Sequence, residues 1–432
     1  MSIPTPSSNP HLSMRRADFA TLTEALDYAA RGETGLNFYS GKGELVEALP
    51  YRDLRQQAMA LARRLLNAGL ERGERVALIA DSDGDFARAF YGCQYAGLVP
   101  VPMPLPVALS GKEGYIAHIR RMIESVGATA AFAPASMEPW LSEAADGLDL
   151  KIVGTLAALN GVQEGDIDLS ALDPSGLSYI QFSSGSTRFP LGVAVTQRAV
   201  MANAKAISQH GLMLRDGDRA VSWLPLYHDM GLVGFLLTPL TCQITIDLLP
   251  TREFARRPFV WLNLISRNRG TLAYSPSFGY ELCARRAETA SIEGIDLSSW
   301  RVAGIGGDMI RPHILSRFSD RFAPSGFQAE SFVASYGMAE VTLALSFAPL
   351  GGGMQSDTID MDALEKKNLA TPFQQGAGRG REFVHCGPAL PGYRVEVRDE
   401  NGNALPARHI GRIFAHGPSL MEGYYGNAEE SA

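Results

Sequence analysis

The sequence predicts an α/β protein with mostly parallel strands, followed by a small β subdomain. Helix-like and strand-like segments alternate from about residue 51 to residue 322. The strand-like segments are apolar throughout, which is typical of parallel strands that helices cover on both faces. The chain has 432 residues, beyond the size at which a single hydrophobic core usually stops growing, so we expect at least two lobes.

The first half of the alternation begins with a helix over residues 51–70. Leu54, Ala58, Leu61 and Leu65 recur there at helical spacing. The elements expected next are a strand over 74–80, a helix over 85–98, an extended proline-punctuated segment over 99–106, a helix over 114–127 and a strand over 128–133.

The second half continues the alternation and then changes character after Pro349. The expected helices cover 198–211, 230–240, 255–268 and 311–322, and the expected strands cover 219–225, 242–250, 271–275 and 300–306. Beyond Pro349 a glycine-rich polar stretch shows helical signal only at "DMDALEKKN". Two short strands, over 393–399 and 411–417, then flank the turn sequence "ENGN".

These patterns predict five parts along the chain. The first is a disordered lead, because the N-terminus is rich in Pro, Ser and Asn. The expected parts are the lead over 1–18, an α/β subdomain over 19–180, a second α/β subdomain with the candidate site over 181–348, a glycine-rich insertion over 349–382 and a β subdomain over 383–432.

Composition and charge exclude several classes of protein. The formal net charge is −7 and the pI is about 5.7, so nothing favours a nucleic-acid or membrane-surface partner. Cys93, Cys242, Cys283 and Cys386 show no CxxC spacing and are expected as free thiols. The longest apolar stretch, 231–249, is interrupted by Pro and Asp and falls short of a membrane span. With no signal-peptide core at the N-terminus, we expect a cytoplasmic protein.

The first chemical motif is the hydroxyl-rich loop in "FSSGSTRFPLG", which follows an apolar strand. Such a loop can turn several backbone N–H groups and hydroxyls onto one anion, and a glycine lets the backbone approach closely. Leu191 stands where a P-loop would carry its lysine, which argues against a P-loop NTPase. A solvated Ser/Gly connection is the alternative for this motif taken alone.

Three further motifs follow apolar strands. In "SWLPLYHDMGLVG", His228 precedes a helix and could donate to a phosphate or carboxylate oxygen, although Asp229 could simply cap that helix. In "GIGGDMIRP" and "ASYGMAE", paired glycines leave room for a flat base on which Tyr336 could stack. Glu340 is a hard oxygen ligand suited to Mg²⁺. Each motif alone also has a plain packing or turn explanation.

The order of these four motifs resembles that of the adenylate-forming superfamily. The phrases that make the chain most similar to the fatty acyl-AMP ligases are "LPLYHDMGLVG", "SPSFGYELCARR", "DLSSWRVAGIGGDMIRP", "SYGMAEVTLALSF" and "VHCGPALPG". The resemblance spans about residues 20–426. It implies the large N-terminal domain of the adenylate-forming fold, with two βαβ subdomains and a small distorted β-barrel subdomain.

The resemblance also implies an activity and its participants. Members of the family join a fatty acid to AMP, using ATP and Mg²⁺, and release pyrophosphate. The medium- or long-chain acyl group then passes to an acyl carrier protein or a polyketide synthase carrier domain. The expected insertion sits where these ligases carry one associated with poor use of coenzyme A, which favours a carrier-protein acceptor.

Residue roles follow from the same resemblance. His228, Glu340 and Thr187 are implied as catalytic, with Glu340 also the metal ligand. The implied nucleotide-binding residues are Ser183, Ser184, Gly185, Ser186 and Thr187 at the phosphates, and Gly307, Asp308, Met309, Tyr336, Gly337, Met338 and Ala339 around the adenine. The implied substrate-binding residues are Trp223, Asp229, Met230, Gly231, Val233, Phe235, Ser277 and Phe278, with Val195 a further candidate for the acyl tunnel; any of these could instead belong to the core.

The family pattern also raises alternatives. A Thr-Gly-Asp motif and a small domain with a catalytic lysine should follow the last residues but are not in this sequence, so we expect an N-terminal domain with slow adenylation. The alternatives are an acyl-CoA synthetase, an amino-acid-activating domain in which Asp229 holds the substrate ammonium, and a non-catalytic binder of acyl groups or adenylates.

Overall fold

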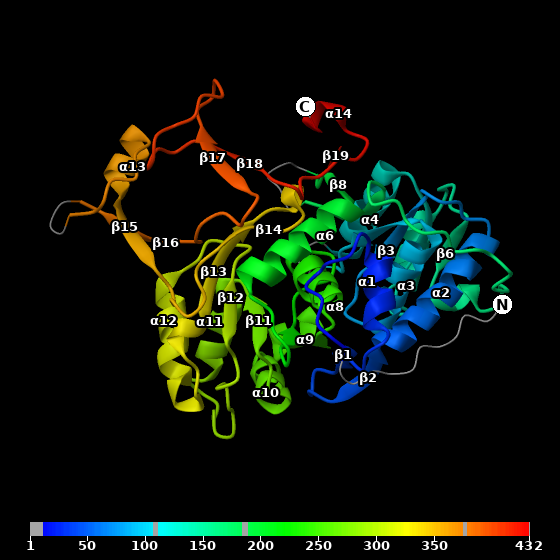
Figure 1. Cartoon of the computed structure of the whole chain (residues 1–432), viewed down its shortest axis with the longest axis horizontal. Coiled ribbons are helices and arrows are strands. Elements are labelled where there is room, and N and C mark those ends of the chain that lie inside the picture. Colours follow the sequence, from blue (N-terminus) through cyan, green and yellow to red (C-terminus); the bar gives the residue numbers. More distant parts are fainter. Residues whose placement is uncertain (1–11, 107–110, 184–188, 375–377, 432) are drawn as a thin grey trace.

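The computed structural model describes residues 12–106, 111–183, 189–374 and 378–431. Its largest element is an eight-stranded sheet with the order β14-β13-β12-β11-β9-β10-β1-β2 (Figure 1). The strands from β13 to β1 pair in parallel, and the two edge strands, β14 and β2, pair antiparallel. The bounds are β1 Gly35–Tyr39, β2 Leu45–Pro50, β9 Arg219–Ser222, β10 Thr245–Leu248, β11 Leu272–Ser275, β12 Val302–Ile305, β13 Phe332–Gly337 and β14 Ala344–Phe347.

Two smaller sheets lie beside the large one. A four-stranded parallel sheet has the order β4-β3-β5-β6, and an antiparallel sheet has the order β19-β8-β7. The bounds are β3 Arg75–Ile79, β4 Val99–Met103, β5 Ala128–Phe132, β6 Ile152–Gly154, β7 Leu177–Phe182, β8 Gly192–Thr196 and β19 Gly423–Tyr424. The prediction of an α/β fold with mostly parallel strands is therefore confirmed.

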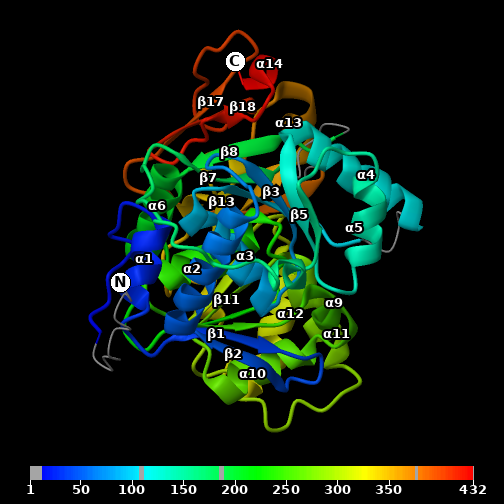
Figure 2. The ribbon, with the colours of Figure 1, turned by 90° about the vertical axis from the view of Figure 1, so that its right-hand side faces the viewer.

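Helices cover both faces of the large sheet, with α10, α11 and α12 on one side and α6 and α8 on the other (Figures 1 and 2). The helix bounds are α1 Leu22–Ala29, α2 Tyr51–Asn67, α3 Gly84–Ala96, α4 Gly111–Val126, α5 Glu138–Ala145, α6 Gln197–Ala206, α7 Asp229–Leu232, α8 Thr238–Thr241, α9 Thr251–Arg256, α10 Phe259–Asn268, α11 Ser277–Arg286, α12 Pro312–Phe322, α13 Met361–Lys367 and α14 Ala428–Ser431. Two π-helical turns, η2 Ile207–Gly211 and η3 Val233–Leu237, continue α6 and α7. Helices α1, α5, α11 and α14 were not expected.

Local chemistry explains where the expected helices begin and end. In α2, the four apolar residues at helical spacing are all buried, as the pattern predicts. The N-cap of α3 is Asp83, whose side chain accepts a hydrogen bond from Phe86 N at 2.8 Å. The same helix ends at Gly97, whose φ of 70° is a left-handed conformation that favours glycine.

The division of the N-terminal part differs from the expectation. Strands β1 and β2 belong to the large sheet, because β1 pairs with β10, so the boundary near residue 180 does not separate the sheets. Residues 1–11 of the expected lead lie outside the described part of the chain. The remainder packs on the protein: Ala17 is buried, its N–H bonds Thr241 O at 3.1 Å, and Arg15 N bonds Gln243 Oε1 at 2.7 Å.

The C-terminal part consists of hairpins, and no closed barrel forms among the described residues, which corrects that part of the expectation. Strands β17 Arg394–Arg398 and β18 Arg412–His416 pair antiparallel, as the flanks of "ENGN" predict. The insertion contains an unexpected hairpin of β15 Ser356–Asp360 and β16 Gly380–Val384, with α13 between them. In Figure 1 these hairpins stand apart from the large sheet.

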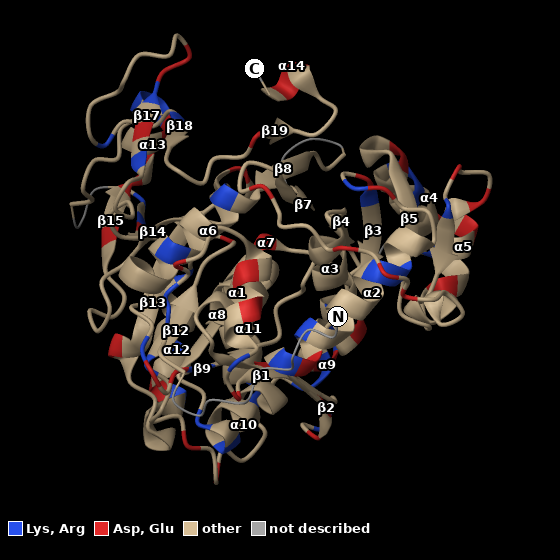
Figure 3. Cartoon of the chain, turned by 45° about the vertical axis from the view of Figure 1, so that its right-hand side comes forward, with Lys and Arg blue, Asp and Glu red and all other residues tan. Residues whose placement is uncertain are grey.

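Within the described ranges, no helix is long and apolar enough to cross a membrane. Lys/Arg and Asp/Glu positions are interspersed over the outer helices, as Figure 3 shows.

Candidate active site

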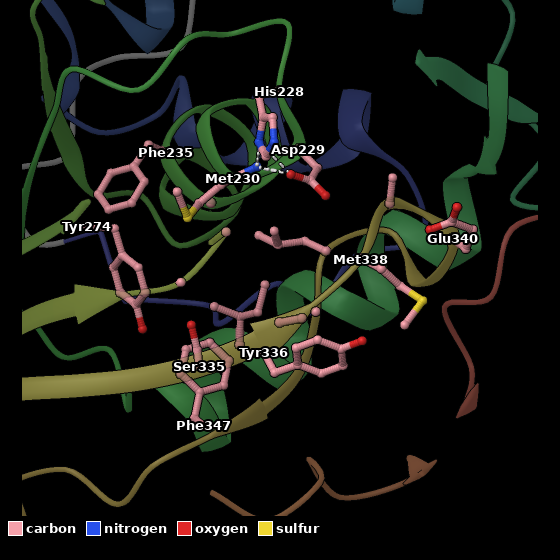
Figure 4. A pocket seen from close by; sticks show the side chains of 18 of the residues that line it. His228, Asp229, Met230, Phe235, Tyr274, Ser335, Tyr336, Met338, Glu340 and Phe347 are labelled. Carbon is pink, nitrogen blue, oxygen red and sulfur yellow. Dashed lines mark hydrogen bonds and ion pairs between the residues drawn. The ribbon is translucent and has the colours of Figure 1, made fainter. Parts of the chain in front are cut away.

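A cavity of about 250 Å³ lies at the carboxyl ends of the central strands of the large sheet. Residues following β9, β12 and β13 line it, together with the π-helical turns η2 and η3. Its polar lining residues include Ser183, His228, Asp229 and Glu340, and its apolar ones include Phe235, Leu343 and Phe347. Figure 4 shows Glu340 at the end opposite Phe235 and Phe347. Ligand sites of open α/β sheets lie at this edge of the strands.

At the polar end, His228 and Asp229 form a close pair at the start of α7. His228 Nδ1 lies 2.7 Å from Asp229 Oδ1, and Met230 N donates to the same oxygen at 2.7 Å. Burial lowers the pKa of His228, but the hydrogen bond and charge of Asp229 outweigh burial and raise the pKa above its usual 6.5. With Nδ1 engaged by Asp229 and Met230 N, Nε2 is the ring nitrogen left for a ligand.

Gly231 in α7 has a packing role rather than lining the cavity. A Cβ at this position would lie 2.1 Å from the carbonyl oxygen of Pro225. Only glycine therefore lets α7 pack this closely against the segment that follows β9. Gly234, one turn later, does line the cavity, and a Cβ there would lie 3.5 Å from Leu343 Cδ2. The two glycines, which share helical spacing in the sequence, therefore serve different purposes.

Glu340 is held in place by residues from the C-terminal part. Tyr424 Oη donates to Glu340 Oε1 at 2.8 Å, and Met421 N donates to the backbone carbonyl of Glu340 at 2.9 Å. Burial, together with the hydrogen bond and charge of Glu340, raises the pKa of Tyr424 to about 12. Tyr424 lies on β19, opposite Val193 of β8, the strand that follows the hydroxyl-rich loop. Sequence reasoning missed Tyr424, because 84 residues separate it from Glu340.

The glycine pair and Tyr336 border the cavity from two neighbouring strands. Gly307 has a φ of 77°, a left-handed conformation. Tyr336 is 37% exposed, which leaves part of its ring uncovered beside the cavity. Gly306 also lines the cavity, as do Gly337, Met338 and Ala339.

Asp308, Met309 and Ser277 do not line the cavity. Asp308 Oδ1 instead accepts from Met309 N at 2.6 Å. Ser277 Oγ bonds the same loop, accepting from Arg311 N at 3.1 Å. Their nucleotide- and substrate-binding roles stay predictions.

The candidate acyl residues divide among the cavity, the core and, for Phe278 at 48% exposed, the surface. Met230 and Phe235 line the cavity. Trp223 stacks on Phe254 with ring centroids 3.9 Å apart, and it is almost fully buried, as are Val233 and Val195. Phe278 packs edge-on against Trp223. Sequence reasoning missed the lining residues Ile207, Leu212, Tyr274, Leu343 and Phe347.

The hydroxyl-rich loop is described only at its ends. Ser184, Gly185, Ser186 and Thr187 lie outside the described residues, so their expected roles at the phosphates stay predictions. Ser183 lines the cavity, its N–H donates to Leu191 O at 2.8 Å, and its hydroxyl accepts from Leu191 N at 3.3 Å. Leu191 thus closes the base of the loop through its backbone.

The residues at the polar end fit a magnesium ion. Mg²⁺ is usually held by one or two carboxylates together with substrate phosphates. Glu340 supplies a half-buried carboxylate beside the cavity, with Oε1 oriented by Tyr424. In the described part of the chain no group of three or more His, Cys, Asp or Glu gathers as a metal site; a dedicated protein cage of that kind is not what Mg²⁺ requires.

The fold and the cavity define an adenylate-forming enzyme, and comparisons with known proteins agree. The AMP-binding enzyme family matches residues 36–425. A solved structure from a study of fatty acyl-adenylate ligases of E. coli and L. pneumophila superimposes with a TM-score of 0.93 at 43% identity, covering 97% of this chain and 76% of that one.

Two curated relatives narrow the class. A putative acyl-CoA synthetase of Caulobacter vibrioides is 54% identical over 100% of this chain and 75% of its own length. The medium-chain-fatty-acid–[acyl-carrier-protein] ligase JamA of Moorena producens is 30% identical over 97% of this chain and 72% of its own. The chain belongs to the AMP-binding enzyme family, and within it to the fatty acyl-AMP ligases, as the motifs predict.

Proposed function

We propose that the protein activates a medium- or long-chain fatty acid with ATP, forming acyl-AMP and pyrophosphate for transfer to an acyl carrier protein. The observation that carries this proposal is the two-ended cavity. Its polar end brings together His228, Asp229 and Glu340, and its apolar end offers Phe235 and Phe347. An acyl-adenylate has the same division, because a charged phosphate joins a nucleoside to a hydrocarbon.

The chemistry asks for positioning and charge stabilisation. A carboxylate oxygen of the fatty acid attacks the α-phosphorus, and the bond to the leaving pyrophosphate breaks. His228, whose pKa is raised by Asp229, donates to the carboxylate and α-phosphate oxygens and stabilises their negative charge. The Tyr336 ring and the Gly306–Gly307 backbone hold the adenine. Mg²⁺, held by Glu340 when bound, would neutralise phosphate charge. Catalysis of phosphoryl-type transfer rests mainly on such positioning and electrostatics.

Pyrophosphate release tests the adenylation step. The purified protein is incubated with ATP, Mg²⁺ and saturated fatty acids of increasing length, and in parallel with amino acids. We expect release with fatty acids and none with amino acids. Release only with amino acids would refute the proposal and favour the reading in which Asp229 holds an ammonium. If none of the fatty acids or amino acids causes pyrophosphate release, but an acyl-adenylate analogue binds tightly, the result would favour the non-catalytic binder.

The acceptor is a separate part of the proposal. A carrier protein is supported by the insertion hairpin of β15 and β16 and by the name of the Moorena producens relative. Coenzyme A is the second candidate, favoured by the name of the 54% identical Caulobacter vibrioides relative. Incubation of preformed acyl-AMP and protein with either holo carrier protein or coenzyme A separates the two. Acylated carrier protein without acyl-CoA is the expected product.

A further inference from the structure

The turn between β13 and β14 carries a polar and an apolar lining residue on either side of a strained position. Glu340 precedes this position, in the short 3-10 turn η6 Ala339–Val341, and Leu343 follows it; both line the cavity. Thr342, between them, has φ 74° and ψ −56°. A β-branched residue rarely adopts a positive φ, so the surrounding structure has to hold this conformation in place.

A serine from the C-terminal part holds this turn. Ser419, between β18 and β19, is completely buried, although its neighbour Leu420 is 39% exposed. The Ser419 hydroxyl donates to Val341 O at 2.8 Å, and the Ser419 backbone carbonyl accepts from Thr342 Oγ1 at 2.9 Å. One inward-facing residue therefore bonds both the strained threonine and the residue before it.

Asn203 on α6 continues the same network on the other side of the turn. Its side chain is fully buried, Nδ2 donates to Ala344 O at 2.9 Å, and Oδ1 accepts from Ala344 N at 3.0 Å. Nδ2 also lies 3.0 Å from Ser419 Oγ, which accepts a further hydrogen bond from Tyr393 Oη at 2.7 Å. Ile207, one helical turn after Asn203, lines the cavity. The network thus ties α6 and the C-terminal part to the turn.

This buried network uses its hydrogen-bonding capacity within the protein. Ser419 Oγ donates once and accepts twice, which is all that a hydroxyl can do. None of the network residues Asn203, Thr342, Tyr393 and Ser419 is among the described residues that line the cavity. Fully satisfied polar networks of this kind make the surrounding backbone rigid. The network therefore acts on the site through the backbone of the turn.

We propose that Ser419 and Asn203 are positioning residues for adenylation, which hold the strained turn at Thr342 and thereby place Glu340 and Leu343 in the cavity. This inference rests on the proposed function, because the two placed groups are the Mg²⁺ ligand and part of the acyl wall. Without the network, Thr342 would relax toward the ordinary negative φ. Because Glu340 and Leu343 flank Thr342, both would be displaced, and metal and acyl binding should weaken in the same variants.

Two measurements follow the two placed groups separately. The Mg²⁺ concentration for half-maximal pyrophosphate release reports on Glu340. Calorimetry with the non-reactive probe decanoyl-sulfamoyl-adenosine, in the absence of Mg²⁺, reports on the acyl wall without requiring turnover. We expect Ser419→Ala to need roughly tenfold more Mg²⁺, the usual effect of losing an outer partner of a metal ligand. It should bind the probe about fourfold more weakly, as when one methylene group loses its burial.

A pair of substitutions at Thr342 isolates the hydrogen bond to Ser419. Thr342→Ser keeps the hydroxyl and should leave the Mg²⁺ requirement and the probe affinity close to those of the unaltered protein. Thr342→Val keeps the branched shape but removes the hydroxyl, and it should shift both quantities in the same direction as Ser419→Ala. This pair decides the inference if Ser419→Ala does not fold.

Ser178→Ala is the matched control for the loss of a buried serine hydroxyl. Ser178 on β7 is fully buried, its hydroxyl lies 3.5 Å from Gln94 Oε1, and it does not line the cavity. The control should change neither the Mg²⁺ requirement nor the probe affinity. Shifts as large as those of Ser419→Ala would overturn the inference, because they would show general loosening. A folded Ser419→Ala or Thr342→Val protein that shifts neither quantity, or only one of them, would also overturn it.

The calorimetric measurement keeps this inference apart from the proposed function. If the unaltered protein releases no pyrophosphate, the proposed adenylation fails, while probe binding and calorimetric titration with Mg²⁺ and a nucleotide analogue still decide whether the network positions both groups. If the unaltered protein releases pyrophosphate and the network variants match it in both quantities, the function stands and the inference is overturned. Failure of the unaltered protein to bind the probe would overturn the inference together with the proposed location of the acyl-adenylate.

Discussion

The polar groups at the two ends of the large sheet differ in how fully their hydrogen-bonding capacity is used within the protein. At the amino ends of β9, β11 and β12, Asp218 accepts from Arg301 Nε at 2.8 Å, from Thr271 Oγ1 at 2.8 Å and from Arg215 N at 2.9 Å. Both carboxylate oxygens are used, and the side chain is 1% exposed. At the carboxyl ends, His228 and Glu340 line a cavity and each keeps hydrogen-bonding capacity beyond its one side-chain partner.

The hydrogen bonding of the charged groups distinguishes a structural charge cluster from a functional one. Both ends contain buried charged groups, so burial of charge alone does not mark a site. At the amino end, the hydrogen-bonding groups around Asp218 all have partners within the protein, so no ligand is required there. The carboxyl end orients each group through one partner, Asp229 for His228 and Tyr424 for Glu340, and leaves the remaining capacity for something that enters.

The largest expected effect is on stability at the amino end. Asp218→Asn leaves the Arg301 guanidinium without its charge partner, and breaking a buried pair typically costs about 3–5 kcal/mol. Denaturant unfolding at neutral pH measures the loss. Glu143→Gln, which breaks the exposed pair of Glu143 with Lys112, should cost less than about 1 kcal/mol. Equal losses of unfolding free energy in the two variants would contradict the structural role assigned to the Asp218–Arg301 pair.

The same pair gives a pH dependence with a defined sign. Burial raises the pKa of Asp218, but the hydrogen bonds and charge of Arg301 outweigh it, so the folded pKa lies below the usual 3.8. The contribution to stability is therefore present above about pH 3.8 and lost as the pH falls through the folded value. The stability difference between the protein and Asp218→Asn should narrow over that acid range.

The next effect is on activity at the carboxyl end. His228→Gln removes a charged donor from the polar end of the cavity and should slow pyrophosphate release by about 10²–10³, the usual effect of losing one such donor. His313→Gln, an exposed residue on α12, is the matched control and should leave the rate unchanged. A His228→Gln protein of full activity would remove His228 from the proposed site.

Tyr424→Phe tests whether the C-terminal strand positions Glu340. Outer partners of metal ligands typically contribute 10–100-fold to metal affinity. The variant should therefore need roughly tenfold more Mg²⁺ for half-maximal pyrophosphate release, and calorimetric titration with Mg²⁺ and a nucleotide analogue should show the same shift. Tyr425→Phe alters the neighbouring ring, which lies beside Arg75, and should not change the Mg²⁺ dependence. Identical Mg²⁺ titrations for both variants would show that Tyr424 only packs.

The smallest effect is a change in the titration of His228. Asp229 raises the pKa of His228 against the opposing effect of burial, so Asp229→Asn should bring it below its usual 6.5. The pair contributes stability below about pH 6.5, which is lost as the pH rises through the folded value. NMR titration of the imidazole measures the pKa directly. A pKa unchanged by Asp229→Asn would mean that Asp229 does not hold the ring.

Much of the fold was predictable because helix and strand periodicities are local. The apolar spacing in α2 and the apolar runs of β3 and β12 specify these elements within a few residues. The assignment of β1 to the large sheet was not predictable, because its pairing with β10 spans about 210 residues of sequence. Helix α11 was missed because its sequence, "SFGYELCARR", begins directly after Pro276 and carries no clear apolar stripe.

The site was predictable where residues carry chemistry in a short motif, as with His228 and Glu340. It was not predictable where a role depends on long-range packing. Trp223 looked like a lining residue, but its stacking on Phe254 places it in the core. Whether such a side chain lines the cavity or belongs to the core cannot be predicted from the local sequence.

The most direct test of the central claim is a crystal structure of the protein with decanoyl-sulfamoyl-adenosine. We expect the adenine between the Gly306–Gly307 backbone and Tyr336, and the sulfamoyl group within hydrogen-bond reach of His228. The acyl chain should run toward Phe235 and Phe347. A nucleoside bound elsewhere, or an acyl chain that leaves the cavity empty, would contradict it.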